Sequence, residues 1–345
     1  MDATIAAFLL QDGLTTGAIY ALIALALVLV FAVTRVIFVG QGDLVVFGAL
    51  TLASLQAGML PPTFWLLLGC AVAGCVLDCA IAIRHQHLWR LPRILLNYLL
   101  PSALVWVALS AFDLKNLPGL AQVALTLLVV TPLGPLLYRL VYQRLAETSV
   151  LMLLIVSVAL HIVLLGLSLL LFGAEGFRTE ALSDIALSVG EMQISLQSLM
   201  VIGCALGLIV MLYLLFGHTL YGKALRATAF NRNGAQLVGI PTRLAGQAAF
   251  ALAALIGACS GILIGPLTTL YYDSGFLISL KGFVAAIIGG LASYPMAAAG
   301  AFLVGTLESF SMFWASAYKE VIVFTLVIPV LLILSLKHSH SGEEH

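Results

Sequence analysis

Charged residues are scarce in this sequence. Asp, Glu, Lys and Arg make up only 9% of its 345 residues, against about 25% in a typical soluble domain. The 15 acidic and 15 basic residues balance each other, so no basic excess favours binding to nucleic acid. The composition therefore excludes an ordinary soluble domain and argues against a nucleic-acid-binding protein.

The sequence also lacks the motifs of several chemistries. It contains no GxxxxGK[ST] P-loop, so we do not expect the chain to hydrolyse ATP by itself. Its five cysteines lie in apolar stretches and show no Cys/His spacing typical of a metal site. We therefore predict no metal ion, no directly bound cofactor and no catalytic residues.

Long hydrophobic runs are what the sequence does have. Stretches such as 13–34, 44–77 and 244–272 carry no charge and exceed the roughly 20 residues that a membrane-spanning helix needs. We predict an all-α, polytopic membrane helical bundle of about 9–11 spans, forming a single transmembrane domain over 1–345. The expected spans are 10–33, 43–59, 63–83, 94–112, 119–138, 149–172, 192–216, 244–265, 277–292, 296–316 and 320–336.

The basic residues predict how these spans are oriented. Short loops rich in Lys and Arg stay on the cytoplasmic side, and such residues cluster at Arg35, at 84–93, at 139–144 and at 223–243. The loop at 173–191 carries mostly acidic residues, which fits the opposite side. The N-terminus is then outside, and the C-terminus with its solvated tail, 338–345, is cytoplasmic.

Two of the expected spans are short and lie in corresponding places of two pseudo-repeated halves. The segments 43–59 and 277–292 each follow a long hydrophobic helix and a polar or glycine-bearing break. Paired interrupted helices indicate a transport pathway, because free backbone groups inside a membrane need protein or water beside them. We place the pathway between the break at Gly40–Asp43, the helix face bearing Tyr20, and a second break around Ser279–Gly282. Its expected residues are Tyr20, Gln41, Gly42, Asp43, Ser279, Lys281 and Gly282.

Charged residues near apolar spans are costly and each requires an explanation. Asp43 either caps a helix N-terminus or lines the pathway. Lys281 either reaches the outer membrane interface, lines the pathway or pairs with an acid. For Glu308 a hydrogen bond to a neighbouring helix is favoured over a substrate role, and Asp78 is expected to pair with Arg84.

The longest polar segment, 218–243, contains four basic residues and no acidic one. Its pattern predicts two short amphipathic helices broken near Asn231–Gly234 and ended by Gly239–Pro241. From composition alone, this loop could lie on anionic lipid or dock on a partner protein.

Several ordered motifs resemble the membrane subunits of branched-chain amino acid ABC importers of the LivH type. They are GAIYALIALALVLVFAVTRVIFVGQGD near the N-terminus, VVTPLGPLLYRLVYQRL in the middle, and GKALRATA, AQLVGIP, GACSGILIGPL and GFLISLKGFVAAIIGGLASYPMAAAGAFLVGTLES in the C-terminal half. The likeness covers about 1–59 and 119–336.

The resemblance implies a multi-pass permease of the bacterial inner membrane. Its partners would be a second homologous permease subunit, two ATP-binding subunits that use ATP, a periplasmic substrate-binding protein and the lipid bilayer. The loop would dock on an ATP-binding subunit through Gly222, Lys223, Arg226, Ala227 and Gly239. The substrate would be a branched-chain amino acid or a related small amino acid, amide, urea or carboxylate. An ion-coupled secondary transporter is the alternative, although such a carrier needs no basic docking loop.

Three departures from the family pattern are visible. Phe38 and Gln41 replace the usual Asn and His of the first break, and Phe230-Asn231 replaces an acidic pair in the docking loop. The segment 60–118 has no recognised counterpart and reads as two spans around a basic loop. We predict that it is a two-span insertion at the periphery, outside the pathway.

Overall fold

The computed structural model describes residues 3–87, 89, 91–181, 185–189, 192–291, 293–326, 328–330 and 332. The expected tail at 338–345 and the side of the membrane that holds the C-terminus lie outside these residues. Within them the chain is a helical bundle, and eight helical segments are long and apolar enough to cross a membrane.

The helices follow the hydrophobic runs closely, and each expected span has a helix or a helical stretch in its place, with residues 327, 331 and 333–336 of the last span lying outside the description. Those before the docking loop are α1 (Ala3–Thr34), α2 (Gln41–Gln56), α3 (Thr63–Arg84), α4 (Leu91–Ala111), α5 (Gly119–Val130), α6 (Leu133–Leu137), the π-helical turn η3 (Tyr138–Tyr142), α7 (Val150–Phe172) and α8 (Leu196–His218). Those after it are α11 (Thr242–Ile264), α12 (Ser274–Ile288), α13 (Tyr294–Ala315) and α14 (Lys319–Thr325). Short 3-10 turns occur at Leu114–Asn116 and Ser316–Tyr318.

One small β-hairpin departs from the expected pattern. Strands β1 (Ala186–Val189) and β2 (Met192–Ser195) pair antiparallel with Ala186 opposite Ser195. The prediction that a span begins at 192 was therefore wrong by a few residues. Helix α8 starts at Leu196 because the side chain of Ser195 caps it, accepting a hydrogen bond from the backbone N–H of Ser198 at 3.1 Å.

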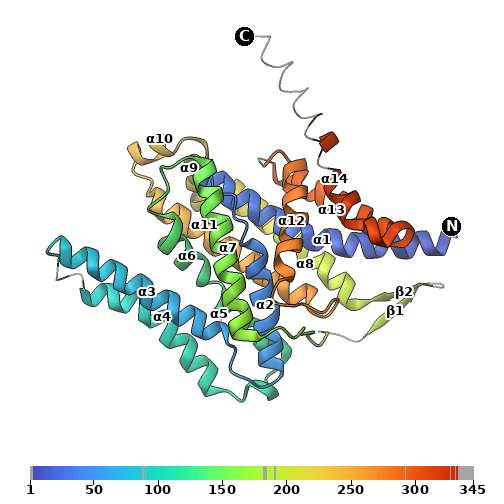
Figure 1. Cartoon of the computed structure of the whole chain (residues 1–345), viewed down its shortest axis with the longest axis horizontal. Coiled ribbons are helices and arrows are strands. Elements are labelled where there is room, and N and C mark those ends of the chain that lie inside the picture. Colours follow the sequence, from blue (N-terminus) through green and yellow to red (C-terminus); the bar gives the residue numbers. More distant parts are fainter. Residues whose placement is uncertain are drawn as a thin grey trace, which may run out of the picture.

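The central helix of the bundle is α1. Every side chain from Ala18 to Val30 is at most 4% exposed, and the helix contacts α8, α11, α12 and α13 (Figure 1). The two halves interlock, since the long helix of each half packs on the short helix of the other: α1 on α12 and α11 on α2. The all-α helical bundle is confirmed, whereas the relation of the two halves by a repeat stays a prediction.

Helices α3 and α4 form a hairpin at the edge of the bundle (Figure 1). Helix α4 packs on α3 and α5, and α3 packs on α5, α6 and η3. Most side chains of α4 are exposed, as expected of a helix that faces lipid. That 60–118 is an insertion stays a prediction.

The contact between α1 and α13 depends on glycine. A Cβ atom at Gly305 would lie 2.3 Å from the backbone nitrogen of Gly17 and 2.5 Å from the carbonyl oxygen of Gly13. Small residues let membrane helices approach this closely, and the close approach supplies the packing energy.

We therefore expect Gly305→Ala to separate α1 from α13 and to destabilise the protein by about 1–3 kcal/mol, as overpacking does. Gly207→Ala is the matched control, because a Cβ there meets no atom within 4 Å. Thermal unfolding in detergent measures both. Equal melting temperatures for the two variants would contradict this packing.

Candidate functional site

The first turns of α2 and α12 touch through their backbones. A Cβ atom at Gly42 would overlap the carbonyl oxygen of Gly275, and one at Gly275 would lie 2.6 Å from the carbonyl oxygen of Gly42. Neither position can carry a side chain without moving backbone. The N-terminal ends of the two short helices therefore meet at one point, which we call the glycine contact.

Hydrogen bonds hold the chain around the glycine contact. The hydroxyl of Ser279 donates to the carbonyl oxygen of Val39 at 3.2 Å, and the side-chain amide of Gln41 donates to the carbonyl oxygen of Ala253 at 3.0 Å. The N–H of Val39 donates to the hydroxyl of Ser157 at 2.8 Å. Free backbone groups before α2 are thus bonded to α12 and to α7, as groups buried in a membrane protein must be.

The carboxylate of Asp43 pairs with a histidine. Its Oδ2 lies 2.8 Å from Nδ1 of His161 on α7, and the ring of His161 stacks on Phe276 of α12 with centroids 5.1 Å apart. The helix-capping alternative for Asp43 is wrong, because Gly40 occupies the cap of α2 and no side chain bonds there. Sequence reasoning missed His161, although a single histidine in the apolar run 149–172 was a visible signal.

A second cluster of charge lies between α1, α12 and α13. Nζ of Lys281 is 2.5 Å from Oε1 of Glu308 and 3.1 Å from a carboxylate oxygen of Glu320, and the hydroxyl of Tyr20 donates to Oε2 of Glu308 at 2.7 Å. The expected hydrogen bond of Glu308 to neighbouring helices is confirmed. Extension of Lys281 to the outer interface is wrong, because its side chain is only 8% exposed and paired.

The expected pathway residues thus fall into two groups. Gln41, Gly42, Asp43 and Ser279 surround the glycine contact, whereas Tyr20 and Lys281 belong to the charge cluster. Gly282 packs on Ile23, since a Cβ at this glycine would lie 2.5 Å from Cγ2 of that side chain. The second break was misplaced: Ser279, Lys281 and Gly282 lie inside α12, and the interruption precedes Ser274.

Two further expectations concern single side chains. Phe38, the departure from the family pattern, is fully buried and packs on Phe250 and Tyr142 with ring centroids 5.0 Å and 6.1 Å away. Phe38 therefore belongs to the packed core next to the first break, Gly40–Asp43. Asp78 does not pair with Arg84 as expected, because its carboxylate is bonded to Arg139 at 2.5 Å and to the hydroxyl of Tyr98 at 2.7 Å.

The docking loop forms two helices, α9 (Leu220–Phe230) and α10 (Arg232–Leu237). The break between them is narrower than expected, because Asn231 alone separates them and caps α10 by accepting from the N–H of Gly234 at 2.9 Å. Gly239 ends the loop with φ +83°, a conformation that favours glycine. Gly222 is buried against α8, whereas Lys223 and Arg226 are exposed.

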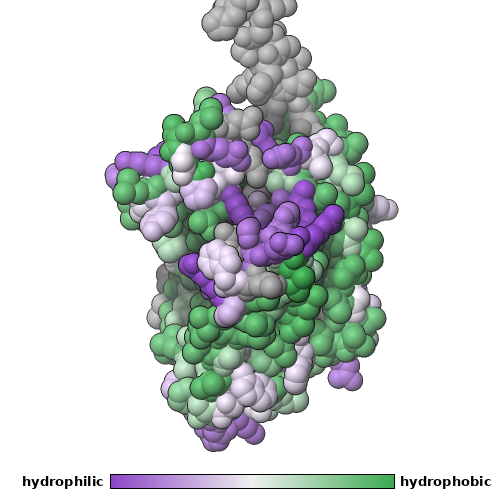
Figure 2. Space-filling model, turned by 90° about the vertical axis from the view of Figure 1, so that its left-hand side faces the viewer, coloured by the Kyte–Doolittle hydropathy of each residue, from purple (hydrophilic) through white to green (hydrophobic). Residues whose placement is uncertain are grey.

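Basic residues from separate loops line common cavities. Arg35 and Arg226 line one cavity, and Arg139, Arg144 and Arg243 line another. Figure 2 shows hydrophilic side chains gathered on the upper part of one face of the molecule, with hydrophobic surface below them. The gathering agrees with a common cytoplasmic side for these loops. The structure does not describe the side chains of Arg90, Arg232, Asp184 and Glu191.

Comparison with known proteins identifies the family. The family model described as "Branched-chain amino acid transport system / permease component" matches residues 97–335, more than half of the chain. The chain belongs to this family. It is a transport subunit and a multi-pass membrane protein, and its described helices fit that role.

Curated relatives agree with this assignment. The chain is 23% identical to the high-affinity branched-chain amino acid transport system permease protein LivH of Escherichia coli over 333 residues, covering 94% of this chain and 92% of that protein. It is 25% identical over 332 residues to the permease protein BraD of Pseudomonas aeruginosa, with the same coverage. A probable LivH of Methanocaldococcus jannaschii is 32% identical over 134 residues, or 36% of this chain and 42% of that one. No solved structure shows a significant match.

The charge cluster of this permease generates a prediction. Lys281→Met leaves Glu308 buried without its cation, which costs about 3–5 kcal/mol when a buried pair is broken from one side. In the double variant Lys281→Met/Glu308→Gln, the amide oxygen still accepts from Tyr20, and the one carboxylate that loses its cation is Glu320, whose side chain is 35% exposed. We expect the double variant to unfold at a higher temperature than Lys281→Met alone.

A double-mutant cycle on thermal unfolding in detergent measures this coupling. Additive losses from Lys281→Met and Glu308→Gln would contradict a direct pair between the two side chains.

Proposed function

We propose that this chain is the permease subunit of an ATP-driven importer for branched-chain or related small amino acids. The observation that carries the proposal is the exposed surface of α9 and α10. Tyr221, Phe230 and Leu237 are 85%, 92% and 89% exposed, and Lys223 and Arg226 lie among them. Large apolar side chains in a basic, hydrophilic surface are typical of a docking site for another protein.

The proposed partner at this surface is an ATP-binding subunit. Lipid is a weaker candidate, because the exposed apolar residues are interspersed with asparagine and with basic residues rather than arranged on one continuous helix face. Two such subunits would use ATP, a second permease subunit would complete the membrane part, and a periplasmic binding protein would deliver substrate. The complex would lie in the bacterial inner membrane with the C-terminus of this chain in the cytoplasm.

The proposed pathway runs beside the glycine contact. The N-termini of α2 and α12 meet there, and helix N-termini favour an anionic group such as the carboxylate of an amino acid. Among the described residues, the buried Oε1 of Gln41 has no hydrogen-bond partner. An ammonium or amide donor of a passing solute would satisfy it. The side chains of Gln41 and Asp43 are buried in the structure. We therefore assign the structure to a closed state of the pathway.

The contacts of the loop support an action on the closed pathway. Gly222 packs against the end of α8, since a Cβ there would lie 2.6 Å from Cα of Phe216. A cavity of about 620 Å³ separates α9 from the end of α1 and from the turn before α13, with Arg35, Phe230, Leu291 and Tyr294 in its wall. Movement of α9 into this space would press on α1 and on the end of α12.

We expect Arg226→Glu to abolish ATP-driven uptake while the protein remains in the membrane. The reversed charge opposes docking of an ATP-binding subunit at an exposed residue that makes no structural hydrogen bond in the described chain. The matched control is Arg84→Glu, a charge reversal at the end of α3 on the same side.

Copurification of the ATP-binding subunit and uptake of radiolabelled leucine into membrane vesicles measure the two effects. Normal copurification and uptake in Arg226→Glu would mean that the loop does not dock. Equal losses of copurification and uptake in the Arg84→Glu control would mean that the total charge on this side of the protein matters, and not the charge of the loop.

A further inference from the structure

A groove between the edge hairpin and the rest of the bundle is not used by the proposed transport function. Its largest part is a cavity of about 480 Å³ between α3 and α4 on one side and α6, η3 and the start of α11 on the other. A smaller cavity of about 260 Å³ adjoins it and shares Asp78, Arg139 and Arg243. We call the two together the basic groove.

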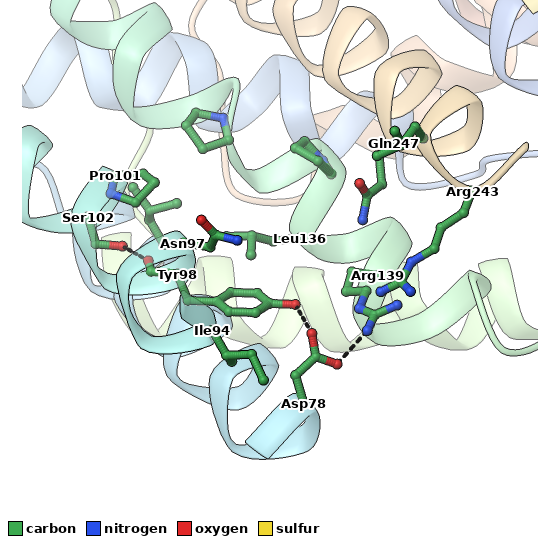
Figure 3. A pocket seen from close by; sticks show the side chains of 14 residues that line it. Asp78, Ile94, Asn97, Tyr98, Pro101, Ser102, Leu136, Arg139, Arg243 and Gln247 are labelled. Carbon is green, nitrogen blue, oxygen red and sulfur yellow. Dashed lines mark hydrogen bonds and ion pairs between the residues drawn. The ribbon is translucent and has the colours of Figure 1, made fainter. Parts of the chain in front are cut away.

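The basic groove holds more positive charge than its own carboxylate neutralises. Both oxygens of Asp78 are used, one by Arg139 and one by the hydroxyl of Tyr98 (Figure 3). Arg144 and Arg243 also line it, and no carboxylate of the described residues lies within ion-pair distance of either. Two unpaired guanidinium groups therefore face the same space.

Uncharged polar groups face the groove as well. Figure 3 shows Asn97 of α4 and Gln247 of α11 pointing into it from opposite walls. No hydrogen bond within the described chain involves either side chain. Asn97 is exposed in the first half of α4, directly after Leu95 and Leu96, and an amide among apolar side chains is costly unless a polar group bonds it.

An apolar groove continues from the basic one along the same hairpin. It has a volume of about 330 Å³, is lined by Phe64, Trp65, Leu68, Leu99, Ala103 and Trp106, and meets the basic groove at Ser102. The basic end lies where α3 ends and α4 begins, and the apolar part lies toward the other end of both helices. An occupant that matches both parts is anionic at one end and long and apolar at the other.

We propose that the basic groove binds an anionic phospholipid of the cytoplasmic leaflet. The phosphate lies against Arg144 and Arg243, Asn97 and Gln247 bond the glycerol and ester oxygens, and an acyl chain follows the apolar groove between α3 and α4. Arginine suits this role because its planar fork binds phosphate oxygens through paired hydrogen bonds. Basic pockets between membrane helices on the cytoplasmic side bind such headgroups. The lipid would fill the space between the edge hairpin and α11.

The test is lipid retention by the purified full-length protein, with and without its partner subunits. The protein is equilibrated with equal amounts of phosphatidylglycerol and phosphatidylcholine, and the bound lipids are counted by native mass spectrometry. We expect phosphatidylglycerol to be preferred and this preference to fall about tenfold in Arg144→Gln/Arg243→Gln, because each arginine near the headgroup contributes to binding. The control Arg84→Gln/Lys115→Gln removes the same charge at two exposed residues outside the groove and should keep the preference. Melting temperatures in lipid-free detergent establish that both variants fold.

Four results would overturn the proposal. Two concern the preference: equal retention of the two lipids by the unaltered protein, and an equal fall of the preference in the control variant. Displacement of phosphatidylglycerol by excess inorganic phosphate would indicate a site for free anions. Loss of the lipid when the partner subunits assemble would indicate a protein interface.

Discussion

The backbone contact between Gly42 and Gly275 is the constraint on which the other features of this permease depend. It brings the N-terminal ends of two interrupted helices together inside an apolar bundle, where every exposed N–H group must find a partner. Because α2 packs on α11 and α12 packs on α1, this contact lies between the two halves. A solute passing between the halves would have to separate or bypass it.

Buried charge pairs connect the interrupted helices to their surroundings. Asp43 joins α2 to α7 through His161, and Lys281 joins α12 to α13 through Glu308. Each pair is costly to break inside a membrane, because a buried polar or charged group is left without its partner. In our account, α2 and α12 therefore move together with α7 and α13, which would give the proposed docking helices α9 and α10 large rigid parts to act on.

Much of this structure could be predicted from the sequence. Uninterrupted apolar runs require helices in a membrane, so the positions of the spans and the two short segments followed from hydropathy and glycine. The partners of the buried charges could not be predicted, because they depend on how each helix is rotated about its axis. Asp43 pairs with His161 of α7, and Asp78 pairs with Arg139 rather than with Arg84, which is closer in the sequence. The second break was misplaced into α12, where Gly282 allows close packing on Ile23.

The central claim is that the chain around the glycine contact opens to water during transport. The most direct test is a single cysteine at Ser279, a conservative change next to the contact, in a protein whose five native cysteines are replaced by alanine. Our account predicts that a membrane-impermeant thiol reagent does not label this cysteine in the resting complex, where Ser279 is only 4% exposed. Labelling should appear when ATP and loaded binding protein drive turnover. The same slow labelling rate in both conditions would contradict the account.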